Sequence, residues 1–136
     1  GSLIFSEGDK NLYMHSFENL GLVPELLRSV SDLGFVNPTP IQEKTIPAIL
    51  NQDNDLVALA QTGTGKTAGF GLPIQQQIDH GMKDVQALIL SPTRELAIQI
   101  TRDLDSYSTY LPRIKHVAVY GGADIQKQIK ALKEHP

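Results

Sequence analysis

The sequence predicts an α/β fold in which helices cover both faces of a parallel sheet. Three apolar segments of strand length alternate with stretches whose apolar residues recur at helical spacing, as is typical of βαβ units. The first of these segments runs directly into a glycine-rich loop that ends in Gly-Lys-Thr. The 136 residues fit one domain, and 40% hydrophobic with 20% charged residues is typical of a globular protein.

The chain divides into a short terminus and one organised part. Residues 1–15 are mixed and polar, so we expect a flexible N-terminal segment there. Gly1 and Ser2 resemble an expression scar. Residues 16–136 make up the organised part, which we expect to be a single, partial domain.

The first helix is predicted between Phe17 and Gly34. Pro24 suits a first helical turn, and Gly34 suits the position just after the last turn. The apolar residues at helical spacing are Val23, Leu26, Leu27, Val30 and Leu33.

A second helix is predicted from Pro40 towards Leu50, with Pro47 as a kink or interruption. Thr39 and Gln42 have the spacing of a capping box, in which each side chain bonds the backbone N–H of the other residue. Pro40 stands at the first helical position, where proline is favoured. Capping therefore explains Gln42 from the local pattern alone.

The loop after the first predicted strand has the arrangement that a phosphate-binding site needs. Its eight residues are Ala60, Gln61, Thr62, Gly63, Thr64, Gly65, Lys66 and Thr67. The glycines let N–H groups turn inward, and the next helix directs its positive end to an anion. Lys66 would reach the β- and γ-phosphates, and Thr67 would place its hydroxyl on Mg²⁺. The general pattern has glycine in place of Ala60, so an ordinary strand–helix turn stays an alternative.

The remaining elements continue the alternation. We expect a helix over residues 66–80 with a kink at Pro73, a buried strand at 86–90, a helix from about 96 that ends before Pro112, a third strand at 116–120, and a last helix from near Ile125. Ligands of parallel sheets bind outside the carboxyl ends of the strands. The loops at 60–67, 91–95 and 121–122 should therefore share one functional face.

Composition excludes several kinds of site. The chain has no cysteine, which excludes disulfides and thiolate metal sites. A net charge of −3 and a pI near 5.7 argue against a strongly basic nucleic-acid binder, but not against contacts from backbone amides. The four histidines, at positions 15, 80, 116 and 135, have no metal-ligand spacing, so we expect surface or packing roles for them. No apolar run has membrane-spanning length and no signal peptide is apparent, so we expect no membrane partner and a cytoplasmic protein.

Four stretches, in this order, resemble the motifs of DEAD-box RNA helicases. They are Phe17 with residues 34–42 (the Q motif and its upstream aromatic residue), residues 60–67 (the phosphate loop, where alanine at the first position is usual), residues 92–97 (motif Ia) and Gly121 with Gly122 (the paired glycines). The resemblance covers almost all of residues 17–136. It implies a RecA-like P-loop fold, truncated to the N-terminal part of the first of two such domains.

For the nucleotide site, the resemblance implies ATP and Mg²⁺ as cofactors. Gln42 would read adenine, because its amide can accept from N6 and donate to N7. Phe17 would stack on the base, although a structural place in the core is the alternative for it. Phe35 and residues 60–67 would complete the cofactor site. Lys66 and Thr67 would be the catalytic residues, with Thr67 as the metal ligand.

For RNA, the resemblance implies phosphate contacts from Pro92, Thr93, Arg94, Gly121 and Gly122. Arg94 offers a guanidinium fork, and Thr93 and the glycines offer a hydroxyl or exposed backbone N–H groups. Such contacts fix the position of RNA but read no sequence. A salt-bridged helix start is the alternative for Arg94 and Glu95.

Several parts of the family pattern do not occur in the chain. There is no Asp-Glu-Ala-Asp tetrapeptide, no Ser-Ala-Thr motif and no second domain. We therefore expect the ATP-binding portion of an ATP-dependent RNA helicase that remodels RNA duplexes by ATP hydrolysis, and no turnover by the chain alone. In folds of this kind other strands lie between the strands at 55–59 and 86–90. We expect open strand edges there, which another copy or another chain completes. A second domain of the parent protein is a further expected partner.

Two other interpretations stay open at this point. One is a non-catalytic module that holds nucleotide or RNA without turnover. The other is an unrelated P-loop enzyme such as a small kinase, which has no use for the stretch around Gln42 or for motif Ia.

Overall fold

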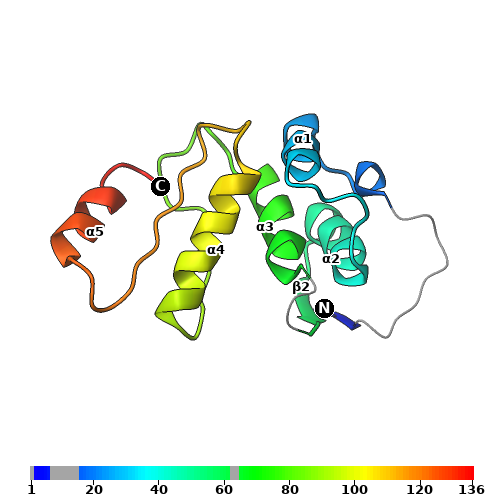
Figure 1. The fold of residues 1–136 in the computed structure, drawn as a ribbon, viewed down its shortest axis with the longest axis horizontal. Coiled ribbons are helices and arrows are strands. Elements are labelled where there is room, and N and C mark those ends of the chain that lie inside the picture. Colours follow the sequence, from blue (N-terminus) through cyan, green and yellow to red (C-terminus); the bar gives the residue numbers. More distant parts are fainter. Residues whose placement is uncertain (1, 7–15, 62–64) are drawn as a thin grey trace.

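The computed structural model describes residues 2–6, 16–61 and 65–136 (Figure 1). The elements in chain order are β1 (Ser2–Ser6), the 3-10 turn η1 (Phe17–Asn19), α1 (Pro24–Asp32), α2 (Pro40–Asn51), β2 (Asp55–Leu59), α3 (Lys66–Gln76), α4 (Arg94–Tyr107) and α5 (Ile125–Leu132). Helices α1 to α4 pack together, whereas α5 lies apart at the C-terminal end (Figure 1). Within the described residues, no helix is long and apolar enough to cross a membrane.

The helix starts follow the predicted signals. Pro24 opens α1, and Gly34 takes a positive φ of 81° directly after it, the conformation that a helix-ending glycine provides. Pro40 opens α2 behind a complete capping box of Thr39 and Gln42. Both internal prolines, Pro47 in α2 and Pro73 in α3, lie within their helices.

The apolar core lies between α1, α2, α3 and α4. Its buried members are Phe17, Leu20, Leu22, Leu26, Val30, Ile46, Ala68, Leu72, Ile100, Leu104 and Tyr107. Helix α3 occupies the middle of this group, between α2 and α4 (Figure 1). It ends at Gln76, earlier than the predicted end at residue 80.

Two glycines within α3 allow this close packing. A Cβ on Gly69 would lie 2.8 Å from Oγ1 of Thr45 in α2, and a Cβ on Gly71 would lie 2.7 Å from Cδ2 of Leu104 in α4. The Thr45 hydroxyl donates to the carbonyl of Gly69 at 2.8 Å. Side chains of α2 and α4 therefore lie directly against the backbone of α3, one on each side.

The N-terminal segment differs from its prediction. Residues 2–6, expected to be flexible, form β1, which pairs in parallel with β2 from Ser2 opposite Asp55 to Ser6 opposite Leu59. An apolar strand edge binds an available extended segment, and the chain's own terminus satisfies this requirement. The boundary drawn at residue 16 stays a prediction.

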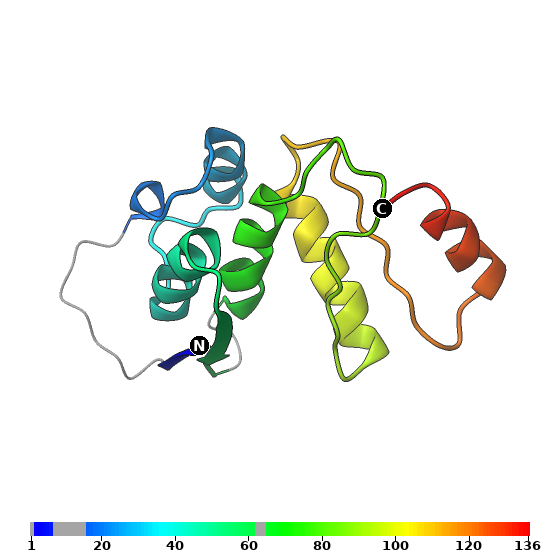
Figure 2. The ribbon, with the colours of Figure 1, turned by 180° about the vertical axis from the view of Figure 1, so that it is seen from behind.

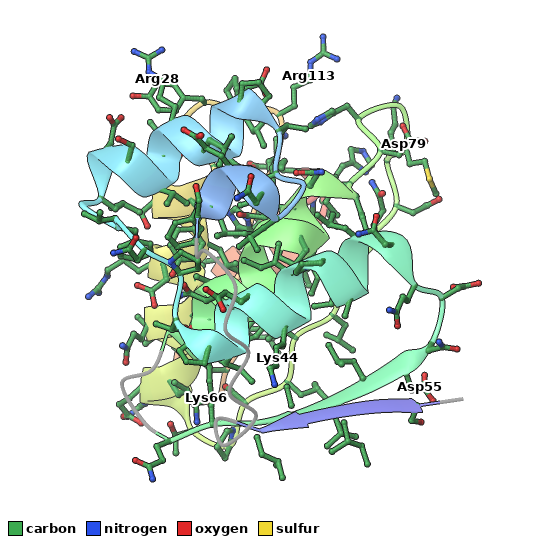
Figure 3. The ribbon with its side chains drawn as sticks, turned by 90° about the vertical axis from the view of Figure 1, so that its right-hand side faces the viewer. Arg28, Lys44, Asp55, Lys66, Asp79 and Arg113 are labelled. Atoms are coloured by element: carbon green, nitrogen blue, oxygen red, sulfur yellow. The ribbon has the colours of Figure 1, made fainter. Side chains whose placement is uncertain are left out.

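The parallel pairing agrees with the predicted fold class, but the expected cover on both faces is not seen in the described residues. The helices lie on one side of the two strands (Figure 3). On the other side Ile4, Val57 and Leu59 are exposed.

The predicted strands at 86–90 and 116–120 were wrong as strands. Both segments are extended, but neither belongs to a sheet, and Leu88 and Leu90 are 80% and 84% exposed. An extended segment becomes a strand only when a neighbour supplies hydrogen bonds, and no such neighbour lies among the described residues. The two segments run between α4 and α5 (Figure 2).

Helix α5 forms where predicted, with Asp124 accepting from the N–H groups of Gln126 and Lys127. Its apolar stripe is not buried: Ile125, Ile129 and Leu132 are all exposed. The helical period was therefore correct, while the expected packing partner is not among the described residues.

We predict that Gly69→Ala destabilises the chain although alanine is the better helix former. The added methyl would meet the Thr45 hydroxyl that donates to the carbonyl of Gly69, and overpacking of this kind costs about 1–3 kcal/mol. Urea unfolding measures the loss. The double variant Gly69→Ala with Thr45→Ala should recover much of it, and equal losses in both variants would contradict the argument.

Candidate functional site

The phosphate loop joins β2 to α3, as predicted. Residues 62–64, which include Thr62, Gly63 and Thr64, lie outside the described residues. Gly65 is the N-cap of α3 with φ 79°, a left-handed conformation that favours glycine. A Cβ at Gly65 would lie 2.2 Å from Nε2 of Gln42. Both the backbone conformation and the space therefore require glycine at this position.

The start of α3 is suited to an anion. The caps of α2, α4 and α5 are the side chains of Thr39, Thr93 and Asp124, which accept from the first free N–H groups. Helix α3 has no such side-chain cap and no acidic residue in its first turn. Among the described residues, no N-cap side chain bonds its first N–H groups, and its positive dipole end is directed to the loop.

Lys66 lies across the loop. Its Nζ donates to the carbonyl oxygen of Ala60 at 3.0 Å, and the side chain is exposed where β2 ends (Figure 3). Thr67 follows, half-buried, in the first turn of α3. Because a phosphate oxygen is a stronger acceptor than a carbonyl, it would compete for this ammonium group.

A magnesium ion fits this donor set only in part. Thr67 offers one hydroxyl oxygen, and no group of three or more His, Asp or Glu side chains gathers anywhere in the described ranges. Mg²⁺ keeps several waters and uses substrate phosphates as ligands, so one hydroxyl is compatible with it.

Gln42 caps α2 and also reaches the phosphate loop. It is 3% exposed; its Oε1 accepts from the N–H of Thr39 at 3.0 Å, which confirms the capping box. Its Nε2 donates to the carbonyl of Gly65 at 3.2 Å, so the same amide reaches the phosphate loop. An amide oxygen can accept twice and an amide nitrogen can donate twice, so each atom has capacity for one more bond. Adenine recognition by Gln42 stays a prediction.

Phe17 lies in the core. It is 5% exposed and stacks on Phe35 with ring centroids 6.3 Å apart; Phe35 in turn meets the edge of Tyr107 at 6.4 Å. This burial favours the structural alternative for Phe17, and stacking of Phe17 on a base stays a prediction. Phe35 is partly exposed, so of these rings it has the more accessible surface.

The predicted RNA residues come together from two segments. A Cβ on Gly122 would lie 2.7 Å from Nη1 of Arg94, and Gly122 has φ 82°. Pro92, Gly121 and Gly122 are exposed. The N-terminal ends of α3, α4 and α5 point to one edge of the molecule (Figure 1). The described residues next to these helix starts therefore lie along one edge, as expected.

Thr93 and Arg94 also have local roles. The Thr93 hydroxyl accepts from the N–H of Leu96 at 3.1 Å and so caps α4. Arg94 pairs with Glu95 at 3.5 Å, with both side chains more than half exposed. An exposed pair of this kind contributes little and leaves the guanidinium available.

Two features of the site were missed from the sequence. One is the pair of Thr45 and Gly69, which holds α3 beside Gln42; a glycine within a helical pattern was the available signal. The other is a bond between His116 and Gln75, for which the sequence contains no signal, because their contact exists only in the folded chain.

The strand, the left-handed glycine and the helix that follows it have the order that is typical of phosphate-binding loops in α/β proteins. A family model described as "DEAD/DEAH box helicase" matches residues 39–136. The chain belongs to the DEAD/DEAH box helicase family, and the resemblance found in the sequence is confirmed.

Relatives and solved structures agree with this assignment. The chain is 51% identical over 123 residues to the ATP-dependent RNA helicase CshA of Listeria monocytogenes, covering 90% of the chain and 23% of that protein. The RNA helicase Prp28 of Chaetomium thermophilum bound to ADP superposes with a TM-score of 0.79 at 37% identity, over 93% of the chain and 32% of that structure. Dbp5 of S. cerevisiae bound to RNA and ADP BeF3 superposes with a TM-score of 0.68 at 36% identity, over 71% of the chain and 25% of that structure. The chain thus spans about a quarter of the length of its curated relative.

We predict that the stability of the chain falls as the pH rises from about 10 to about 12. Burial, and next the Asp103 carboxylate, raise the pKa of Tyr107 from 10.0 to about 12. Over this range the unfolded chain loses the phenol proton while the folded chain keeps it, so unfolding is favoured. Urea unfolding at about pH 9 and about pH 11 measures the fall, which Tyr107→Phe should reduce. An equal fall in Tyr107→Phe would refute the assignment to this side chain.

Proposed function

We propose that this chain is the ATP- and RNA-binding portion of an ATP-dependent RNA helicase that remodels RNA duplexes with the energy of ATP hydrolysis. Residues 60–67 hold the triphosphate, Lys66 neutralises the β- and γ-phosphates, and Thr67 holds Mg²⁺. Gln42 reads adenine, and Phe17 and Phe35 border the base. The working protein is cytoplasmic and includes a second helicase domain.

One observation supports the nucleotide part of this proposal above all others. The Gln42 amide bonds the carbonyl of Gly65, so the residue proposed to read the base touches the loop proposed to hold the phosphates. A kinase-like P-loop protein needs no such connection. The relative bound to ADP and the relative bound to RNA and ADP BeF3 support the same ligands.

The RNA part is supported by the contact of Arg94 with Gly122. A guanidinium fork and exposed backbone at a glycine pair suit phosphate oxygens and distinguish no base. Pro92 and Thr93 lie beside Arg94, and Gly121 lies beside Gly122. Sequence-independent RNA binding is therefore the expected behaviour.

The chain by itself is proposed to bind without turnover, which is the binding-module alternative. Its sequence has no Asp-Glu-Ala-Asp tetrapeptide to hold Mg²⁺ and orient the attacking water. Hydrolysis would then belong to the longer protein, in which further chain covers the bare face of β2.

We predict that the chain prefers Mg-ATP to Mg-GTP and that Gln42→Ala removes this preference. Lys66→Ala should weaken both nucleotides by about 10- to 100-fold, as expected for the loss of a charged hydrogen bond. Competition titrations monitored by the amide signals around Gly65 measure both effects.

Thr39→Ala is the matched control. It removes the Oγ1 that caps α2 but keeps the Gln42 amide, so it should lower stability and retain the preference for ATP. Base-indifferent binding by the unmodified chain would favour an unrelated P-loop protein. A Thr39→Ala variant without preference would assign the effect to the cap.

We predict that Arg94→Ala weakens binding of a uridine decamer. The slope of log affinity against log salt should become shallower by about the amount that one phosphate contact contributes. Glu95→Ala is the control, because it removes the ion-pair partner and leaves the guanidinium. Filter binding or fluorescence anisotropy over a salt series measures both. Equal losses in the two variants would contradict an RNA contact from Arg94.

A further inference from the structure

His116 bonds two helices at once. Its Nδ1 lies 2.7 Å from Oδ1 of Asp105 in α4, and its Nε2 lies 2.8 Å from Nε2 of Gln75 in α3. The ring is largely buried, Gln75 is buried, and Asp105 is mostly exposed. We call these three residues the histidine bridge.

The positions of the protons in the histidine bridge follow from one carbonyl. Nε2 of Gln75 also lies 2.8 Å from the carbonyl oxygen of Leu104, which can only accept, so the amide nitrogen must face it. The same nitrogen then donates to His116, and Nε2 of His116 must be unprotonated. Nδ1 therefore carries the proton and donates to Asp105.

Only the nitrogen of the Gln75 amide makes hydrogen bonds among the described residues. Its Oε1 is buried and has no hydrogen-bond partner in the described part of the chain. An unsatisfied buried acceptor is costly, about 1–3 kcal/mol, so turning the amide to suit another histidine tautomer would also strip Leu104 of its donor. The observed orientation is the one that satisfies two groups.

The segment after His116 depends on such side-chain bonds. Through residues 115–122 the described residues show no backbone–backbone hydrogen bond. The Tyr120 end is held by Gln128, which accepts from the Tyr120 N–H at 3.1 Å and donates to its carbonyl at 3.0 Å. The other end is held by the histidine bridge.

We propose that the histidine bridge is a positioning device for RNA binding: by fixing residue 116 to α3 and α4, it holds Gly121 and Gly122 against Arg94. Asp105 belongs to the helix that starts at Arg94, so one rigid element carries both the guanidinium and the anchor of the glycine pair. This inference rests on the proposed function for its RNA part, whereas the bridge itself is testable without RNA.

The first experiment uses the unmodified chain without ligand. A long-range ¹H–¹⁵N correlation spectrum of histidine-labelled protein should show Nδ1 of His116 protonated and Nε2 unprotonated at neutral pH. The exposed His80, in the same spectrum, should show exchange-averaged signals. A proton on Nε2 of His116 would overturn the proposal.

The second experiment compares substitutions at Asp105. Asp105→Ala removes the acceptor, so ¹⁵N order parameters of residues 117–122 should fall and affinity for a uridine decamer should drop about fivefold, the factor of one ordinary hydrogen bond. Asp105→Asn keeps an acceptor oxygen and should restore both. Binding of Mg-ATP should stay unchanged in each variant.

Asp103→Ala, on the same helix but outside the bridge, is the control. Order parameters in Asp105→Ala equal to those in Asp103→Ala would refute the bridge. A fall in order with unchanged decamer affinity would refute its role in RNA binding. If the unmodified chain binds no decamer while the tautomer and order parameters are as expected, the proposed function fails and the bridge stands as a structural anchor.

Discussion

The close approach of α2 to α3 is the constraint on which the rest of the structure depends. Gln42 and Thr45 of α2 donate to the backbone carbonyls of Gly65, the N-cap of α3, and of Gly69 within α3. Such contact is possible only because neither position of α3 has a side chain. The end of the phosphate loop at Gly65 is therefore positioned by hydrogen bonds from side chains of α2 to backbone carbonyls at the start of α3.

The same packing explains why the residues proposed to bind nucleotide and RNA lie on helices that pack together. Helix α3 begins at the phosphate loop and also packs on α4, whose first residue is Arg94. Arg94 contacts Gly122, and the segment before that glycine is anchored to both helices by His116. Each proposed ligand group is thus carried by a helix end, and the helix bodies set the spacing between the ends.

The two-stranded sheet leaves apolar side chains uncovered. Val57 and Leu59 of β2 are exposed on the face that the helices leave bare, and so are Leu88 and Leu90. In the two solved structures named above, the matched region is 32% and 25% of the chain. Exposed apolar side chains of this kind are compatible with the proposal that further chain or another copy covers this surface.

The local patterns of the sequence determined the helix starts, the loop and the family. Local structure explains the roles of Thr39, Pro40 and Gly65, which depend on their own backbone conformation or on a neighbour a few residues away. These roles could therefore be predicted from the sequence. Strands were predicted only in part: β2 forms at residues 55–59 as expected, whereas residues 86–90 have a strand pattern without a strand, and residues 2–6 supply one that the pattern did not predict.

Tertiary structure alone decided which partner each group meets. A strand exists only with a hydrogen-bonded neighbour, and the contact of His116 with Gln75 exists only once α3 and α4 have packed. Likewise, Phe17 lies in the core because Phe35 and the helices enclose it. Local propensity is a property of neighbouring residues, whereas burial and pairing depend on which distant segments the fold brings together.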